Sequence, residues 1–168
     1  TKVYNGETQS VEGFTTNLKD VDLKFADSVK AGASGINAAT YTANFTGVEI
    51  GKTKDTTGNY VVSKVTPGSL VIAQKPVTVT ADNQTRTNRP GEEDPELTWS
   101  VKELAVRDAK TVLTVSVTRE EGAEAGKTYT ITPSGEKIQG NYVVEYKTGT
   151  MTVTDATERL YNYVSFDG

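Results

Sequence analysis

The sequence predicts an all-β protein made of two small domains in tandem. Threonine (27 residues) and valine (20 residues) dominate the 168-residue chain, and both are β-branched residues that favour strands. Short segments of alternating apolar and polar residues recur along the chain, separated by glycine, asparagine and proline turns. Part of the sequence also occurs twice. Each half is therefore expected to be immunoglobulin-like or β-grasp-like, with at most one short helix.

The internal repeat divides the chain. The residues Gly-Asn-Tyr-Val-Val occur at 58–62 and again at 140–144, which is an offset of 82 (140 minus 58). Two Gly-x-apolar-x-apolar segments begin at Gly68 and Gly149, 81 positions apart (149 minus 68). A Thr-Tyr-Thr triplet lies upstream of each block. Self-similarity at a nearly constant spacing indicates tandem repeats. We expect a first unit over residues 1–74, a second over 75–154, and a tail or linker over 155–168.

The first unit is expected to be missing its opening strand. Alternation predicts strands over residues 20–25 and 40–48, and the repeat adds the pair 59–62 and 69–72. The alanine- and glycine-rich residues 31–39 are expected to connect the first two. No counterpart of residues 77–80, the first strand of the second unit, is visible. The missing strand would leave an unpaired sheet edge.

The second unit is expected to have a fuller set of strands. They cover residues 77–80, 97–101, 113–118 and 126–133, followed by a closing pair within 140–154. A polar loop over 82–96 and a short helical turn over 102–110 are expected between them. Pro76 lacks a backbone donor and predicts a stiff joint between the units. The first and last strands of each unit are expected to lie parallel and adjacent, and residues 159–166 add an edge strand or form a linker.

Composition excludes several classes of function. Cysteine and histidine are both absent, which removes disulfides, thiolate and imidazole catalysis and the usual zinc sites. The formal net charge of −4 disfavours binding to nucleic acid. No apolar run approaches the roughly 20 residues that span a bilayer, so direct membrane insertion is not expected. No nucleophile–base pair is visible either, so we expect no enzyme and no cofactor.

Several motifs of the second unit carry a family resemblance. They are residues 77–83, 94–99, 113–122, 126–131 and 149–153. Together they resemble the MBG domain of bacterial surface proteins, and the first unit is similar to the related YDG-type repeat through residues 2–6 and 58–60. Pro90 stands where that family commonly has tyrosine, and Glu103 where glycine is common. The resemblance implies a repeat of long adhesin-like or stalk-like proteins, mostly Gram-positive, without catalytic residues.

Three aromatic residues are candidates for ligand contact. Trp99, Tyr129 and Tyr142 would make a stacking platform for a carbohydrate if they lay together. The alternative is that they pack, because aromatic residues at strand period usually face a core. Trp99 alternates with Leu97 and Val101, which favours packing.

The sequence offers residues for two other kinds of site. The acidic residues 92–94 and 120–124 carry the oxygen ligands that calcium prefers, but they lack the spacing of a calcium loop, so solvated loop charge is favoured. A Lys–Asn isopeptide bond would need a buried lysine beside an asparagine and a carboxylate. Lys24 with Asn44, or Lys147 with Asn141, are the conceivable pairs.

The sequence therefore predicts a non-catalytic repeat segment of an exported bacterial surface protein. It is expected to lie outside the cell, at the cell surface or in the cell wall, as a stalk, spacer or adhesion module. Its expected partners are neighbouring repeats of the same chain. The alternative is direct binding of a host glycan or protein through loops such as residues 82–96.

Overall fold

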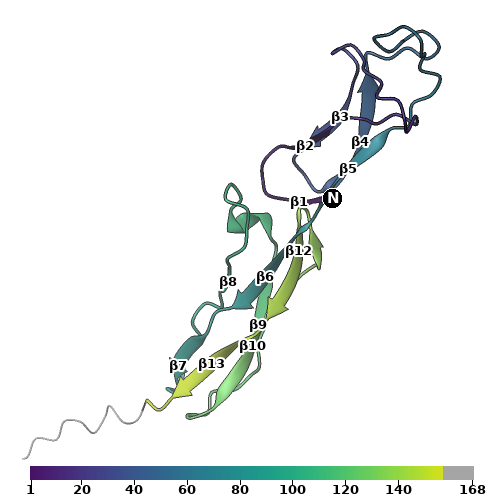
Figure 1. The fold of residues 1–168 in the computed structure, drawn as a ribbon. Helices are drawn as coiled ribbons and strands as arrows, with labels where there is room; N and C mark the ends of the chain where they lie inside the picture. Colours follow the sequence, from purple (N-terminus) through teal and green to yellow (C-terminus); the bar gives the residue numbers. More distant parts are fainter. Residues whose placement is uncertain (157–168) are drawn as a thin grey trace, which may run out of the picture. The chain divides into compact units, whose positions relative to one another are not determined.

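The computed structural model describes residues 1–156 (Figure 1). It divides into two compact units, Thr1–Lys75 and Pro76–Gly168, and each is described by itself below. The described residues form strands and one short 3-10 turn, η1 (Lys110–Val112), so the predicted all-β class is confirmed. Among residues 1–156, no helix has the length and apolar character that a membrane crossing requires. The predicted role of residues 159–166 lies outside the described residues.

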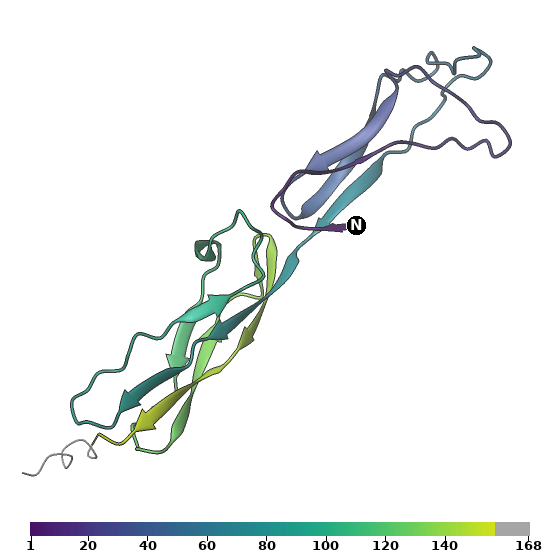
Figure 2. The same cartoon turned by 60° about the vertical axis from the view of Figure 1, so that its left-hand side comes forward.

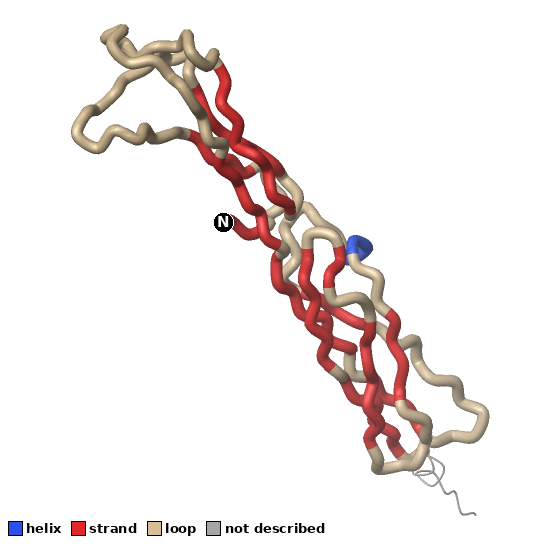
Figure 3. Tube along the Cα trace, turned by 90° about the vertical axis from the view of Figure 1, so that its right-hand side faces the viewer, coloured by secondary structure: helices blue, strands red, loops and turns tan. Residues whose placement is uncertain are grey.

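Unit one is built on one five-stranded sheet. Its strands are β1 (Lys2–Val3), β2 (Gln9–Glu12), β3 (Lys30–Gly35), β4 (Ala39–Thr46) and β5 (Gly68–Ala73). Their order in the sheet is β1-β5-β4-β3-β2. The strands of the sheet are antiparallel except for β1 and β5, which run parallel. The loops of this unit gather beyond one end of the sheet (Figure 3).

The alternation of β4 places its apolar side chains on one face, as predicted. Ala43 is buried, Tyr41 and Phe45 are half-buried, and the residues between them are exposed. Leu70 and Ile72 of β5 are almost fully buried beside them. Period-two burial of this kind is what a sheet with one covered face produces. The core of unit one therefore lies on a single face of the β4–β5 pair.

Residues 31–39, expected as a connection, instead contain most of strand β3. A Cβ atom on Gly35 would lie 2.2 Å from Cζ of Tyr41, so the tyrosine ring covers the strand at that point. A Cβ atom on Gly32 would lie 2.8 Å from the carbonyl oxygen of Val11 on β2. The small residues are thus required by close neighbours on β4 and β2, which local composition does not reveal.

Two strands expected in unit one are absent from the structure. Residues 20–25 lie in the long loop between β2 and β3. Leu23 and Phe25 are half-buried there, so the alternation marks which side chains turn inward rather than a strand in a sheet. Residues 59–62 form only an isolated bridge between Lys54 and Val61. Alternation predicts an extended backbone, whereas a strand also needs a neighbour with which to exchange hydrogen bonds.

Unit two contains two four-stranded sheets (Figure 2). Its strands are β6 (Lys75–Ala81), β7 (Gln84–Thr87), β8 (Trp99–Val101), β9 (Ser116–Arg119), β10 (Thr128–Ser134), β11 (Ile138–Gln139), β12 (Tyr142–Lys147) and β13 (Gly149–Thr154). One sheet has the order β7-β13-β10-β9 and the other the order β11-β12-β6-β8. Ala81, Ile131 and Met151 form a buried cluster in this unit.

Two segments of unit two each serve both sheets. The first passes from β6 to β7 through Asp82 and Asn83, and the second passes from β12 to β13 through Thr148. The segments approach each other closely at the crossing, where a Cβ atom on Gly149 would lie 2.4 Å from the carbonyl oxygen of Ala81. The side-chain oxygen of Asn83 accepts a hydrogen bond of 2.9 Å from the backbone nitrogen of Thr150. The two sheets are therefore covalently and sterically joined.

The region between β8 and β9 differs from the prediction. The helical turn expected over residues 102–110 is replaced by the 3-10 turn at Lys110–Val112. The strand expected over 113–118 begins only at Ser116. Leu113 is buried, and the backbone nitrogen of Thr114 donates to Oε1 of Gln139 at 2.7 Å instead of to a strand. A side chain thus satisfies the backbone where the alternation predicted a sheet.

Parallel pairing of terminal strands occurs in both units. In unit one, Lys2 and Val3 of β1 pair with Ile72 and Ala73 of β5. The unit therefore has a two-residue strand where the sequence predicted none. In unit two, β13 pairs in parallel with β7 from Met151–Gln84 to Thr154–Thr87. The parallel partner of the last strand there is β7, the continuation of the first strand β6.

Candidate functional site

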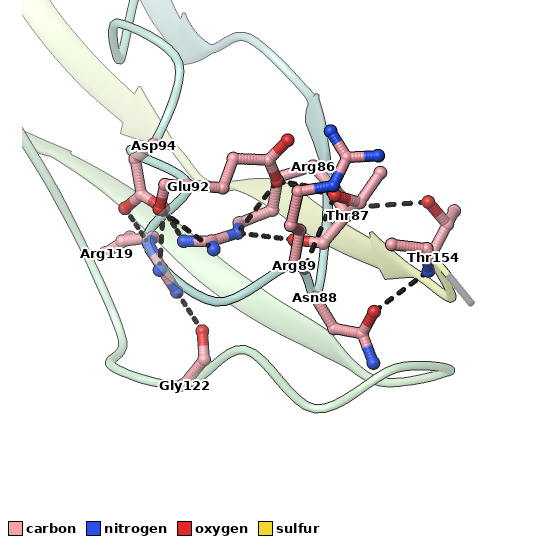
Figure 4. Close-up of polar contacts among 10 residues, drawn as sticks. Arg86, Thr87, Asn88, Arg89, Glu92, Asp94, Arg119, Gly122 and Thr154 are labelled. Carbon is pink, nitrogen blue, oxygen red and sulfur yellow. Dashed lines mark hydrogen bonds and ion pairs between the residues drawn. The ribbon is translucent and has the colours of Figure 1, made fainter. Parts of the chain in front are cut away.

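Two arginines of unit two converge on a single carboxylate (Figure 4). Asp94, in the loop between β7 and β8, accepts two hydrogen bonds from Arg119 of β9, at 2.6 Å from Nε and 2.9 Å from Nη2. Nη1 of Arg86 on β7 lies 2.6 Å from Oδ1 of the same carboxylate. The arginine side chains are only 10% and 12% exposed. Two-point pairing of this kind is strong and specific in geometry.

Further hydrogen bonds hold the loops around this arginine cluster, which consists of Arg86, Asp94 and Arg119. Nη1 of Arg119 donates to the carbonyl oxygens of Glu120 (2.8 Å) and Gly122 (2.9 Å). Glu92 accepts hydrogen bonds of 2.8 Å from both the backbone nitrogen and the hydroxyl of Thr87. The loop between β7 and β8 is thus tied to β7 and β9 by its own acidic residues. The sequence does not reveal the cluster, because no spacing pattern connects residues 86, 94 and 119.

The acidic segments are occupied by bonds within the chain. Glu124 forms an ion pair of 2.8 Å with Lys127, and Glu120 accepts a hydrogen bond of 3.3 Å from the backbone nitrogen of Thr130. Within residues 1–156, no group of three or more carboxylates is placed to hold a metal ion. The arrangement suits the cross-linking of loops.

We expect unit two to lose stability in acid through Asp94 and Asp82. The hydrogen bonds from Arg119, and then Arg86, hold the pKa of Asp94 below its ordinary value of 3.8, although burial acts in the opposite direction. Hydrogen bonds from Thr98 and then Ser100 likewise lower the pKa of Asp82. A carboxyl with a lower pKa in the folded state stabilises fully above its unfolded pKa, and this contribution is lost as pH falls through the folded pKa.

The measurement is the urea midpoint of unit two between pH 7 and pH 2, followed by the fluorescence of Trp99, the one tryptophan of the chain. The midpoint should hold at neutral pH and fall below about pH 4. The double variant Asp82→Asn/Asp94→Asn should show a shallower fall over the same range. Equal slopes for the two proteins would contradict this assignment.

The three candidate aromatic residues have three different environments. Trp99 is half-buried on β8, with Nζ of Lys110 4.1 Å from its ring centroid. Tyr129 is half-buried on β10 and packs against the cluster of Ala81, Ile131 and Met151. Tyr142 is buried on β12, where its hydroxyl donates to Asp108 and accepts a hydrogen bond of 3.0 Å from the backbone nitrogen of Ala105.

These environments do not assemble the three rings into one platform. Trp99 and Tyr142 belong to strands of one sheet, with β6 between them, and Tyr129 belongs to the other sheet. Tyr142 is 2% exposed, which leaves no ring face for a ligand. Each ring instead packs within its own part of the unit.

The two candidate lysines for an isopeptide bond lie at the surface. The side chain of Lys24 is 71% exposed and forms an ion pair of 2.9 Å with Asp22. Asn44 and Lys147 are also exposed. The burial that such a bond needs is therefore lacking at Lys24 and Lys147.

Unit one contains an open groove of about 510 Å³ that the sequence did not suggest. The loop residues 14–17 and the segment 60–66 line it. Phe14 lies against Phe25 and Phe45, with ring centroids 5.9 Å and 5.7 Å away. Tyr60 and Phe14 remain 40% and 37% exposed. These residues are far apart in the sequence and come together only in the folded unit, so no sequence pattern indicates the groove.

Comparison with known proteins finds one family match, and it lies in the second unit. Residues 77–152 match the model of the MBG domain family, YGX type. No curated protein and no solved structure matches the chain. The match begins within β6, ends within β13 and contains the strands between them. The second unit of this chain is therefore similar to the MBG domain of the YGX type.

Proposed function

We propose that this chain is a non-catalytic, load-bearing segment of an exported bacterial surface protein. Its role is that of a stalk or spacer, its partners are neighbouring repeats of the same polypeptide, and its place is outside the cell. The MBG family is typical of surface proteins, which supports a repeat module of this kind. The observation that carries the proposal is the parallel pairing of β7 with β13 in unit two.

Parallel terminal strands set how the unit responds to tension. A pull on the start of the unit acts on β7 through β6, and a pull on its end acts on β13. Because β7 and β13 are parallel, the two forces run in opposite directions along the same ladder from Gln84–Met151 to Thr87–Thr154. The ladder is then loaded in shear, and its hydrogen bonds share the load. Resistance to forced unfolding is a kinetic property set by such a barrier.

The connection between the units also supports a spacer. Gln74 alone stands between β5 and β6, and Pro76 follows at the second position of β6. A connection this short has few backbone torsions to rotate, and proline holds one of them near a constant value. We therefore propose a stiff joint in place of a flexible linker.

The alternative, binding of a glycan or host protein through residues 82–96, has less support. Asp82 accepts hydrogen bonds from Thr98 (2.7 Å) and Ser100 (2.8 Å). Arg86 and Asp94 pair within the arginine cluster. The polar groups a ligand would need are thus already used inside the unit, which favours the spacer.

Single-molecule force spectroscopy tests the spacer proposal. The chain has no cysteine, so introduced cysteines make unique attachment points. One protein is pulled from its two ends. The control carries Ala123→Cys at an exposed position and is pulled between residue 123 and the C-terminus. Residue 123 lies just before Gly126, and the backbone nitrogen of Gly126 donates to the carbonyl oxygen of Val153 on β13.

End-to-end pulling should unfold unit two at the higher force, because it shears the β7–β13 ladder. Pulling from Ala123→Cys should peel β13 away one hydrogen bond at a time and need less force. Equal forces in the two directions would contradict the load-bearing role.

A further inference from the structure

Unit one contains a position that corresponds to the position of β6 in unit two. In unit two, β6 lies between β12 and β8 and is hydrogen-bonded to both. Its residues Val77, Val79 and Ala81 are buried, and the residues between them are more exposed. β6 thus contributes one apolar face to the core and two edges to its neighbours.

The internal repeat identifies the two neighbours of that place in unit one. The offset of 82 between the Gly-Asn-Tyr-Val-Val blocks aligns residues 60–65 with β12 (Tyr142–Lys147). Ile72 and Val153 align at the offset of 81. Ile72 pairs with Lys2, and Val153 pairs with Arg86. Lys2 therefore corresponds to Arg86, which gives an offset of 84 for the opening strands (86 minus 2). With that offset, β8 aligns with residues 15–17.

These two counterparts are the two walls of the groove. Residues 14–17 and 60–66 both line it, with the aromatic rings of Phe14, Phe25 and Phe45 among the groove residues. The groove therefore lies between the counterparts of β8 and β12, where β6 lies in unit two.

Exposure and hydrogen bonding show the effect of the difference. Tyr60 is 40% exposed, whereas its counterpart Tyr142 is 2% exposed. Val62 is half-buried, whereas its counterpart Val144 is buried. In the described chain, residues 63–66 have no backbone hydrogen bond, whereas β12 is bonded to β11 and β6. Backbone groups without hydrogen-bond partners, beside apolar side chains, are a template for one more strand.

We infer that the groove of unit one is the acceptor site for one β-strand of the chemical character of β6, joined to the chain ahead of β1. The occupant alternates small β-branched apolar residues with polar ones, so that one face covers the aromatic rings. It is joined ahead of β1 because β6 leads into β7, the counterpart of β1, through only Asp82 and Asn83. The inference stands on the comparison of the two units and does not depend on the load-bearing role.

The test extends the full chain with a copy of residues 75–84 placed directly before Thr1. This length brings the copy into register, since Thr1 aligns with Thr85 at the offset of 84. The control extension is the same copy with both valines replaced by aspartate, which keeps the length and removes the apolar face. Hydrogen exchange is measured by mass spectrometry over residues 13–17 and 60–66 in all three proteins.

The valine extension should slow amide exchange over residues 60–66 by about tenfold or more, while the aspartate extension leaves it unchanged. A synthetic peptide of residues 75–84, added to the unextended chain, should protect the same amides in a dose-dependent way. The peptide experiment still tests the inference if the extended protein fails to fold.

Three results would overturn the inference. Equal protection by both extensions would show that the apolar face is not recognised. No protection by either the extension or the peptide would show that the groove does not accept a strand. Protection of the unextended chain that rises with protein concentration would assign the groove to a second copy of the chain.

Discussion

Replacing Tyr142 with alanine should lower the free energy of unfolding of unit two by about 3–5 kcal/mol, the usual cost of removing a buried aromatic side chain. The ring is almost fully buried on β12. Its hydroxyl also accepts the hydrogen bond from the backbone nitrogen of Ala105, which alanine cannot replace. Both losses act in the same direction.

The repeat supplies a matched control for this substitution. Tyr60 occupies the same position in the first Gly-Asn-Tyr-Val-Val block but is substantially exposed. Tyr60→Ala should therefore cost unit one about 1 kcal/mol or less. Urea unfolding followed by Trp99 fluorescence reports unit two, and differential scanning calorimetry reports both units. Similar losses at the two tyrosines would show that burial does not distinguish them.

Asp94→Ala should cost unit two about 2 kcal/mol. Removing one partner of a buried ion pair typically costs about 3–5 kcal/mol, and Asp94 is 33% exposed, so solvent reduces the effect. The substitution removes the carboxylate shared by Arg86 and Arg119, and leaves Arg86 with the more distant carboxylate of Glu92 at 3.8 Å. It also releases the loop between β7 and β8 from β9.

The control is Glu124→Ala, which removes an ion pair with Lys127 whose side chains are both more than half exposed. Exposed pairs contribute little, so the expected loss is much smaller than that at Asp94. Urea midpoints at neutral pH decide between the two. A loss at Asp94 no larger than that at Glu124 would mean that the arginine cluster does not stabilise the unit.

The sequence was most informative where local pattern and strand pairing agree. Alternation located β4, and the glycine that opens each Gly-x-apolar-x-apolar segment marked the start of β5 and β13. The motifs of the second unit led to the MBG family, which the family match confirms. In these segments the side-chain pattern and the hydrogen-bonded neighbour lie in the same register.

The sequence pattern failed to predict the structure where a contact with a residue distant in the sequence decides it. Tyr60 and Tyr142 have the same local sequence, yet only Tyr142 lies on a strand beside β6 and is buried. Residues 31–39 looked like a connection because the ring of Tyr41 requires glycine on β3. The pairing of Asp94 with Arg86 and Arg119 depends on how a loop folds back over the sheet. None of these contacts leaves a periodic trace in the sequence.

The β7–β13 ladder also determines when unit two is able to fold during synthesis. Its first pair joins Gln84 to Met151, 67 positions later in the chain (151 minus 84). At the usual rate of translation, roughly 3–13 s separate the appearance of these two residues. Until then β7 has no partner in its sheet, because β13 has not yet been made. Unit two is thus expected to emerge as an open chain and to fold only when its last strand has been made, as folds dominated by distant contacts do.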